Sequence, residues 1–545
     1  MSAVRNREDA LDHALDVDLD VLVIGGGITG AGVALDAASR GYRVALVERS
    51  DLASGTSSKS SKLVHGGVRY LANADVSMVV EGVRERDRMR RNAPHLVRPL
   101  GFVIPVDSAA DRIKIKAGMS LYDVLSAGRA VRPHAHLGDD EVAQAAPGLV
   151  RGASKGAYRY YDAQTDDARL TLAIAQASRT HGADIINHAD VIGLLESGGR
   201  VVGAQIRDRL SGEDFELRAR WVVSATGVWA ADLWGLTDAG SAMEVVPAKG
   251  THVTLPGHLL PLSQALVLPS GAGDGRMNFV IPWGEQTYIG TTDDPFEGGL
   301  DDHALEQTDA NYLLASVNEA FDLSLTVQDC IGAWSGLRPL LRSKDQSDAD
   351  TKDLSRKHTV VETPNRLVTV TGGKLTTWRQ MAQDVVDHLV AGDGASRRCV
   401  TAELALGASG NAQDGLARVR RAVVDARLDP ALSGSLYHRH GDRAEAVLTR
   451  CIQDGETEVL VPGLPYLLGE VRHAVEHELA RSLDDVLQRR MRVSLRDAAA
   501  GGVGIARAAD ICADVLGWDA TKRDNEIAGY LANVRRERGP VPIRP

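Results

Sequence analysis

The feature that most constrains the fold is a glycine-rich turn placed directly after a short apolar segment near the N-terminus. Residues 20–24 (DVLVI) have the composition of a buried strand. Gly25, Gly27 and Gly30 follow with G-x-G-x-x-G spacing. In a dinucleotide-binding unit these glycines allow a tight turn, close approach of the backbone to a pyrophosphate and close packing of a helix on the strand. The sequence therefore predicts a strand, a turn and a helix that begins near Thr29.

A second apolar stretch, residues 44–47, supports this interpretation because it ends at Glu48. The acid that binds the ribose of a dinucleotide stands about 20 residues after the glycine turn. An ordinary strand-to-helix turn can also contain glycines, so the turn alone would be a weak signal. Together, the turn and Glu48 indicate a site for an adenine dinucleotide, with the helix N-terminus offering N–H groups to the phosphates.

Composition excludes several functional classes. The 545 residues are 44% hydrophobic and 25% charged, which is ordinary for a globular chain of more than one domain. The net charge of -11 argues against nucleic acid as a main partner. The four cysteines are far apart, so they predict neither a disulfide framework nor a zinc site. The acidic first 19 residues do not resemble a targeting peptide, and no run of about 18 apolar residues predicts a membrane-spanning helix, so we expect a cytoplasmic protein.

A hydroxyl-rich segment, residues 54–61, lies shortly after Glu48. Such a segment cannot build a core, but it can donate hydrogen bonds to a phosphate or to a flavin ring. His65, Arg69 and Tyr70 come next and place an imidazole, a guanidinium and a phenol beside a Gly-Gly pair. We interpret this combination as part of a pocket for an anionic substrate, although a surface loop would have a similar composition.

The segment from Gly25 to Tyr70 resembles the FAD-binding front of the FAD-dependent glycerol-3-phosphate dehydrogenases, members of the D-amino-acid-oxidase-like flavoprotein group. Three later stretches strengthen the resemblance: residues 248–252 (AKGTH), 335–340 (SGLRPL) and 371–377 (TGGKLTT). The resemblance implies an α/β fold with a Rossmann-like FAD-binding domain, an inserted antiparallel β substrate domain and a C-terminal α-helical domain.

The resemblance also implies domain limits. An FAD-dependent oxidoreductase domain is expected at residues 18–395 and a C-terminal helical domain at residues 400–540. The FAD-binding parts are expected at about 18–95, 155–245 and 355–395, and the wall of the substrate site mainly at about 245–345, where the pattern changes to short alternating strands.

The C-terminal part carries no obvious chemistry in its sequence. Ser482 and Asp485 form a capping box that predicts the start of a helix. His473 and His477 are spaced i, i+4, but no third ligand is adjacent in the sequence. We therefore expect these histidines on a solvated helix face rather than in a metal site.

FAD, held without a covalent bond, is the implied cofactor, because no motif suggests a Cys or His linkage. Its implied contacts come from the glycine turn, the end of the second strand, the hydroxyl-rich segment and two later small-residue turns. The predicted cofactor-binding residues are Gly25, Gly27, Ile28, Thr29, Gly30, Glu48, Arg49, Thr56, Ser57, Ser58, Ser61, Ala225, Thr226, Gly227, Gly373, Lys374, Leu375 and Thr376.

The implied reaction is oxidation of sn-glycerol 3-phosphate to dihydroxyacetone phosphate, with hydride transfer to FAD. The expected substrate-binding residues are Arg69, Tyr70, Arg338 and Lys374. Arginine suits phosphate because its planar fork donates two parallel hydrogen bonds. The expected catalytic residues are His65, His252, Arg338 and Lys374. Either histidine could take the hydroxyl proton, and the sequence does not decide between them.

Reduced FAD must pass on its electrons, and the sequence shows no iron–sulfur or haem motif. In the resembled dehydrogenases the acceptor is a quinone, which the protein reaches from the inner face of the cytoplasmic membrane as a peripheral protein. Residues 112–125 mix cations with large apolar residues and are the best local candidate for membrane contact. The same pattern fits a strand with one buried face. A homodimer also stays open.

Other activities remain possible from the sequence alone. A glycerol-3-phosphate oxidase would use oxygen, but those enzymes carry an inserted segment after the motif at 335–340, where only residues 342–358 intervene here. A nicotinamide-dependent dehydrogenase would leave residues 371–377 unexplained. The remaining alternatives are another flavin-dependent oxidoreductase of 2-hydroxy or amino acids, and a flavin-binding protein without activity.

Overall fold

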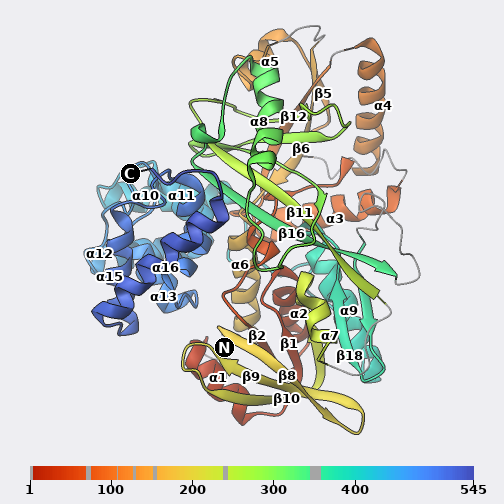
Figure 1. Ribbon diagram of the computed structural model, residues 1–545, viewed down its shortest axis with the longest axis vertical. Coiled ribbons are helices and arrows are strands. Elements are labelled where there is room, and N and C mark those ends of the chain that lie inside the picture. The colour runs from red at the N-terminus through yellow and green to blue at the C-terminus, as the bar shows by residue number, and fades with distance from the viewer. Residues whose placement is uncertain are drawn as a thin grey trace.

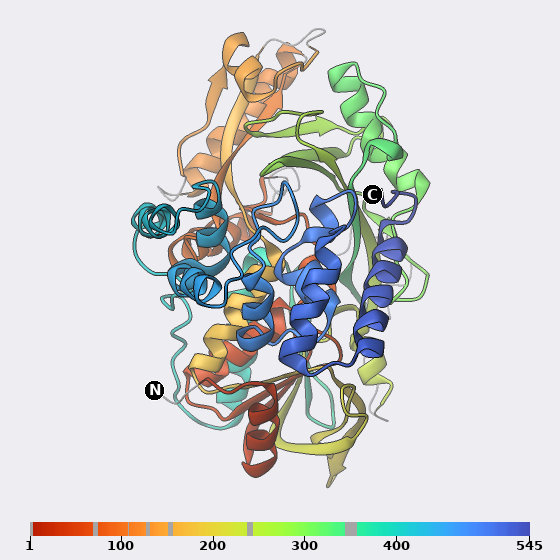
Figure 2. The same cartoon turned by 90° about the vertical axis from the view of Figure 1, so that its left-hand side faces the viewer.

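The computed structural model describes residues 4–68, 75–106, 108–126, 131–150, 156–236, 243–343 and 357–544. Two large sheets stand end to end along the long axis, and a group of helices from the C-terminal part lies beside both of them (Figure 1). The N-terminus begins near the lower sheet, whereas the C-terminus ends near the upper sheet (Figure 2).

The lower sheet has the strand order β17-β18-β10-β1-β2-β7. The strands in this order are β1 (Leu19–Ile24), β2 (Val44–Glu48), β7 (Asp184–Asn187), β10 (Asp214–Ser224), β17 (Thr359–Glu362) and β18 (Leu367–Thr371), and an antiparallel pair, β8 (Ala189–Ser197) and β9 (Arg200–Asp208), joins the sheet through β10. Within the six-strand order, all but β17 run parallel. The parallel strands are nearly all apolar because helices or strands cover both faces of the sheet.

Each face of the lower sheet has its own cover. One face packs on α2 (Ile28–Ser39), α6 (Asp167–Thr180) and α9 (Trp378–Gly392). The other packs on α1 (Arg7–Asp16), β8 and β9. The strand predicted at the N-terminus is therefore confirmed, and the helix after it begins one residue before the expected position.

The upper sheet is mainly antiparallel and has the order β15-β11-β14-β13-β12-β4-β6-β3, with β16 beside β11 and β5 beside β6. Its strands are β3 (Leu63–Val64), β4 (Arg98–Pro105), β5 (Ala135–Leu137), β6 (Ala157–Gln164), β11 (Met243–Pro256), β12 (Ala265–Pro269), β13 (Met277–Trp283), β14 (Gln286–Gly290), β15 (Asp294–Pro295) and β16 (Gly332–Ser343). The upper sheet therefore combines strands from residues 63–164 with strands from residues 243–343.

Helices also cover the upper sheet on both faces. The helix α8 (Gln307–Phe321) packs on one face, and α3 (Val76–Asn92) with α4 (Ala109–Ser126) packs on the other. The same part of the chain also contains short helices: α5 (Asp139–Ala145), α7 (Ala230–Trp234) and the 3-10 turns η1 (Thr56–Ser58), η3 (Gly227–Trp229), η4 (Val327–Asp329) and η5 (Leu375–Thr377).

The C-terminal part is helical and has cores of its own. It contains α10 (Ala412–Asp425), α11 (Leu432–His440), η6 (Gly441–Arg443), α12 (Ala444–Gln453), α13 (Gly469–His477), the π-helix η7 (Asp485–Arg490), α14 (Val493–Arg496), α15 (Gly504–Leu516) and α16 (Ala520–Arg538). The predicted capping box is present, since the Ser482 hydroxyl accepts from the Asp485 N–H and the Asp485 carboxylate accepts from the Ser482 N–H.

The alternative of a strand at residues 112–125 is wrong, because this segment lies within α4. Only one side of the helix is buried, through Met119 and Tyr122. The other side leaves Ile113 and Val124 exposed, at 73% and 72%. In a helix, residues three or four positions apart share a side, so the buried and the exposed apolar residues of this segment lie on different sides. In a strand, alternate residues would share a face instead.

Candidate functional site

A cavity of about 660 Å³ lies along the carboxyl ends of the parallel strands. In an open α/β sheet, ligands bind in this position because the loops that follow the strands all meet there. Most predicted cofactor-binding residues line the cavity: Gly25, Gly27, Ile28, Thr29, Glu48, Arg49, Thr56, Ser57, Ala225, Thr226, Gly227, Gly373, Lys374 and Leu375. Gly30, Ser58, Ser61 and Thr376 lie outside its lining.

The three glycines of the first turn have different physical roles. Gly25 has a φ of +111°, and a Cβ there would lie 2.6 Å from the Ala225 carbonyl oxygen. A Cβ at Gly30 would lie 1.9 Å from the carbonyl oxygen of Gly25. Both positions therefore need glycine because of the protein's own backbone. At Gly27 the nearest atom is the Ser57 hydroxyl at 3.1 Å, so this glycine keeps the cavity wall open instead.

Glu48 stands at the cavity wall at the end of β2. Its carboxylate accepts from the Gly26 N–H at 2.7 Å and from the Ser50 N–H at 2.9 Å. Burial raises the pKa of Glu48, and these two backbone donors oppose that shift. The side chain is therefore held in one orientation by the glycine turn itself, which suits an acceptor for ribose hydroxyls.

The cavity crosses several neighbouring strands, as a dinucleotide requires. The first glycine turn follows β1, the Ala225 turn follows β10, and Gly372 and Gly373 follow β18 with φ values of +80° and +76°. Lys374 comes directly after this last turn and lines the cavity. The residues present thus fit an extended cofactor that carries a pyrophosphate and a ribose.

The expected substrate residues lie beyond the hydroxyl-rich segment, on the β11–β16 pair of the upper sheet. His252 lies opposite Trp334 and Ala248 opposite Arg338 in the antiparallel register. Because alternate residues of a strand share a face, His252 and Arg338 project from the same face of this pair. Neither residue lines the large cavity, although Pro339, next to Arg338, does.

Arg338 is held in place by its neighbours. Its guanidinium donates to Asp293 at 3.0 Å and to the Thr291 hydroxyl at 3.1 Å. A Cβ at Gly250 would lie 2.3 Å from this guanidinium, so the arginine crosses the sheet directly over Gly250. The result is a partly exposed cation in a fixed position.

His252 is buried against aromatic rings. Its Nε2 lies 2.9 Å from the Ser61 hydroxyl, and its ring stacks on Trp334 at 4.6 Å with 5° between the planes. Burial, together with the positive charges of Lys62 and Arg338, places the pKa of His252 well below its usual value. The imidazole is therefore neutral near pH 7. Ser61 thus contacts the histidine rather than the cavity.

The remaining predicted site residues do not line the cavity or lie outside the described residues. The His65 N–H donates to the Thr376 hydroxyl at 3.2 Å, so Thr376 supports the segment that carries His65. His65 is not part of the cavity lining. Arg69 and Tyr70 lie outside the described residues.

Sequence reasoning missed Lys62, which is fully buried next to Trp334, the ring on which His252 stacks. Its ammonium pairs with Asp167 at 3.1 Å and lies 4.4 Å from the centre of the Trp334 ring. Burial lowers the pKa of Lys62 to about 8. A lysine inside a serine-rich run gives no sequence signal of this burial, because its partner Asp167 is more than a hundred residues away.

The expectation of a solvated face is wrong for His473, although His477 is 56% exposed. The His473 side chain is only 11% exposed and lies with His440 and Glu478, where the possible ligand atoms are within 4.8 Å of one another. The Glu478 carboxylate already accepts both Nη groups of Arg169, at 2.7 and 2.8 Å. We therefore assign this cluster to the joint between α6 and the C-terminal helices.

Comparison with known proteins agrees with this architecture. Residues 20–376 match the family of FAD dependent oxidoreductases, and residues 399–523 match the C-terminal domain of alpha-glycerophosphate oxidase. A glycerol-3-phosphate dehydrogenase of Mycobacterium leprae is 39% identical over 522 residues, covering 95% of this chain and 88% of the relative. A mitochondrial glycerol-3-phosphate dehydrogenase of Arabidopsis thaliana is 34% identical, covering 96% and 87%.

Solved structures give the same picture. The glycerol-3-phosphate dehydrogenase of Bacillus halodurans in complex with FAD has a TM-score of 0.82, with 29% identity and 97% coverage of each chain. The L-alpha-glycerophosphate oxidase of Mycoplasma pneumoniae shares the fold at a TM-score of 0.54, with 15% identity over 70% of this chain. The Bacillus halodurans structure contains FAD, and the residues that line the cavity fit this cofactor. The chain belongs to the family of FAD-dependent glycerol-3-phosphate dehydrogenases.

Proposed function

We propose that the protein oxidises sn-glycerol 3-phosphate to dihydroxyacetone phosphate and passes the electrons to a membrane quinone. The observation that carries this proposal is the placement of a fixed guanidinium, Arg338, and a neutral imidazole, His252, on one face of the β11–β16 pair. The hydroxyl-rich segment connects this face to the FAD cavity through Thr56, whose hydroxyl donates to the Leu337 carbonyl. The glycerol-3-phosphate dehydrogenases among the relatives support the substrate.

Arg338 is proposed to bind the substrate phosphate. Asp293 and Thr291 fix its position but leave it partly exposed. A held guanidinium loses little side-chain entropy when a phosphate binds, and it can donate two parallel hydrogen bonds. Arg69 and Tyr70 remain proposed partners in the same role. Glycerol, which lacks the phosphate, should therefore be a poor substrate.

His252 is proposed to take the proton of the substrate's C2 hydroxyl. A base must be unprotonated before the reaction, and burial keeps this imidazole neutral. Its Nδ1 has no hydrogen-bond partner in the described part of the chain, whereas Nε2 is occupied by Ser61. In the tautomer in which Nε2 donates to the Ser61 hydroxyl, Nδ1 is unprotonated and can accept a proton. His65 stays the second candidate for this role.

FAD, when bound, accepts the hydride from C2 of the substrate. Lys374 lines the cavity beside the glycine turn after β18. An ammonium group at that wall stabilises negative charge as it develops nearby. Lys374 is therefore proposed to stabilise the negative charge. Arg338 is proposed to position the substrate, and His252 to accept the proton.

The surface of α4 supports contact with a membrane. Ile113, Leu121 and Val124 are exposed and share one side of the helix, and the cations Lys114 and Lys116 flank this side and are also exposed. Apolar residues bordered by cations suit the interface of an anionic bilayer. No helix in the described ranges is long and apolar enough to span a membrane. The helix α4 packs on one face of the upper sheet, and in the view of Figure 1 it lies on the opposite side of the molecule from the C-terminal helices.

Oxygen is the alternative acceptor, and the match of the C-terminal part to a domain of alpha-glycerophosphate oxidase keeps it in view. Steady-state assays with glycerol 3-phosphate distinguish the two. We expect turnover with a soluble quinone analogue and at most about one hundredth of that rate with dissolved oxygen alone. Equal rates with oxygen would assign an oxidase. No turnover with either acceptor would contradict the proposed substrate or the proposed acceptors.

A further inference from the structure

The order of the parallel strands shows where the adenosine end of FAD must lie. The first glycine turn follows β1, and the ribose-binding acid Glu48 ends the neighbouring strand β2. On the far side of β2 lies β7, with Asn187 in register with Glu48. A dinucleotide that runs from the turn past Glu48 therefore reaches the end of β7 next. His188 is the first residue after β7 and lines the cavity there.

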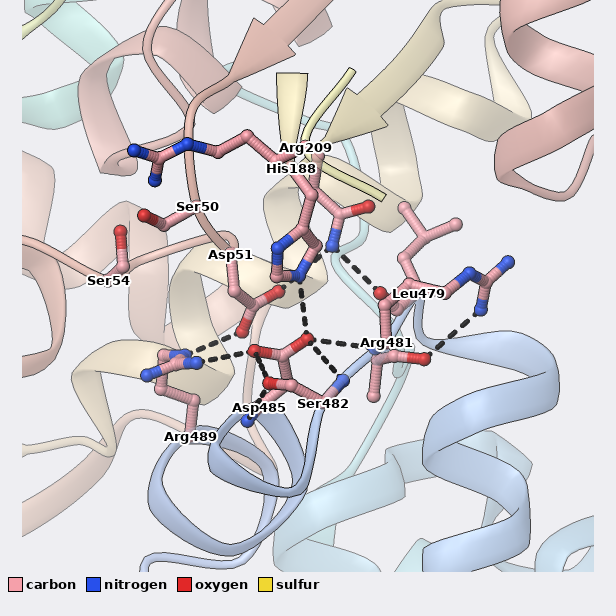
Figure 3. Close-up of polar contacts among 12 residues, drawn as sticks. Ser50, Asp51, Ser54, His188, Arg209, Leu479, Arg481, Ser482, Asp485 and Arg489 are labelled. Atoms are coloured by element: carbon pink, nitrogen blue, oxygen red, sulfur yellow. Dashed lines mark hydrogen bonds and ion pairs between the residues drawn. The ribbon is translucent and has the colours of Figure 1, made fainter. Parts of the chain in front are cut away.

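The backbone of His188 is fixed from both sides. Its φ is +54°, in the left-handed region, which is uncommon for a residue with a side chain. Its N–H donates to the Ser50 carbonyl at 2.6 Å, and its carbonyl accepts from the Arg209 N–H at 2.8 Å. This conformation turns the imidazole toward the C-terminal helices, where Nε2 lies 2.9 Å from the Asp485 carboxylate (Figure 3).

Asp485 is buried and connects several groups. Besides His188, its carboxylate accepts from the N–H groups of Arg481 and Ser482, at 2.8 and 3.1 Å, and from Arg489 at 2.6 Å. The capping contacts with Ser482 would be complete without the histidine. The same residue that starts the π-helix thus also contacts the wall of the FAD cavity.

A second contact also holds the π-helix η7 at the wall of the FAD cavity. Arg489 and Arg490 both donate to the buried carboxylate of Asp51, each at 2.6 Å. Asp51 lies three residues after Glu48, and Asp51, Asp485 and Arg489 all line the cavity. In Figure 3 the free edge of the His188 ring faces away from Asp485, on the side of Ser50 and Ser54, which also line the cavity.

We propose that the C-terminal helical part takes part in FAD binding, with His188 as a cofactor-binding residue at the adenosine end and Asp485 as the residue that positions its ring. Charges around the ring agree with this role. Burial disfavours a charged imidazole and Arg489 repels it, but Asp485 and Asp51 outweigh both, so the pKa of His188 is raised. The ring therefore keeps an N–H for Asp485, and its other nitrogen lies on the edge that faces away from Asp485 (Figure 3).

FAD affinity tests the proposal with two single variants and their combination. Asp485→Asn removes the charged acceptor, and His188→Asn keeps a side chain that tolerates the left-handed backbone but cannot reach Asp485. We expect each to raise the Kd for FAD about tenfold, which corresponds to one hydrogen bond to a charged group. The Kd of the double variant should stay within about twofold of the higher Kd of the two single variants, because the same contact is lost in all three proteins.

The measurement starts from the full-length holoenzyme. FAD release after dilution is followed by flavin fluorescence, and the Kd comes from titration of the flavin-stripped protein, with circular dichroism as the check of folding. ADP, which carries only the adenosine half, serves as a competitor and should lose affinity by the same factor. A loss of affinity for FAD without a loss for ADP would place His188 away from the adenosine end.

A matched control separates cofactor binding from general loss of stability. His440 and Glu470 form another buried histidine–carboxylate pair of the C-terminal part, at 2.8 Å, and neither residue lines the cavity. Glu470→Gln should leave the Kd for FAD within about twofold of the parent. The proposal is overturned if folded Asp485→Asn and His188→Asn proteins bind FAD like the parent, if their effects multiply in the double variant, or if Glu470→Gln weakens FAD equally.

Discussion

The region proposed for the adenosine end of FAD and the region proposed to bind substrate handle charge in opposite ways. At the adenosine end, Asp51 and Asp485 are matched by Arg489, Arg490 and His188 in a buried network. At the substrate face, Arg338 keeps a partly exposed guanidinium and His252 is neutral and buried. The comparison teaches that the carboxylates and cations proposed to hold the cofactor are buried together, whereas the guanidinium proposed to bind the substrate phosphate stays partly exposed.

The largest expected effect is on the cofactor end of this comparison. Gly27→Val places a branched side chain in the cavity that Gly27 keeps open. We expect the protein to purify with almost no FAD, a rise in Kd of at least about a hundredfold, because the pyrophosphate loses its space. The ratio of flavin to protein absorbance measures this. Gly118→Ala on α4, where a Cβ would meet no atom within 4 Å, should purify fully yellow.

On the substrate side, Arg338→Met should lower kcat/KM for glycerol 3-phosphate about 10- to 100-fold, since one charged hydrogen-bond partner is lost. FAD content should stay at the parent level. The control is Arg342→Met, four residues further along β16, where the arginine pairs with Glu244 at 2.8 Å. If both variants lost activity equally, the effect would come from the strand and not from phosphate binding.

A smaller effect is expected from the cation behind the proposed base. Protonation of His252 removes the base, so kcat/KM should fall as pH drops through the pKa of His252, below its usual value. Lys62 lowers that pKa, and Lys62→Met should therefore raise it and move the acid limb of the pH profile to higher pH. An unchanged acid limb would show that another group, with His65 first, is the base.

The smallest effect concerns the exposed side of α4. At about 1 kcal/mol per cation near an anionic bilayer, Lys114→Glu combined with Lys116→Glu should shift much of the protein from pelleted vesicles to the supernatant at low salt. Activity with a soluble dye acceptor should persist. Arg420→Glu combined with Arg421→Glu on α10 makes the same change in charge elsewhere and should sediment as the parent does. Identical sedimentation of both double variants would assign the contact to another surface.

Local sequence patterns predicted the elements that depend on residues close together in the chain. The strand, turn and helix around Gly25, the strand that ends at Glu48 and the cap at Ser482 depend on residues a few positions apart. The membrane candidate on α4 could not be assigned to helix or strand from its pattern, because its apolar residues suit either period. The packing of α4 on the upper sheet decides for the helix.

What the sequence could not predict is the set of contacts between distant segments. His188, Lys62 and His473 each acquire their environment from residues far along the chain, namely Asp485, Asp167 and Glu478. Their own neighbours in sequence gave no sign of burial. The C-terminal part carries no obvious chemistry in its sequence, and only the fold brings its π-helix to the wall of the FAD cavity.

The central claim, that the substrate face delivers a hydride from glycerol 3-phosphate to FAD, is tested most directly without any electron acceptor. Holoenzyme with one FAD per chain is mixed anaerobically with glycerol 3-phosphate, and the absorption of oxidised flavin is followed. We predict that the band bleaches within seconds and that glycerol at the same concentration leaves it nearly unchanged. An oxidised spectrum that glycerol 3-phosphate does not alter would contradict the account.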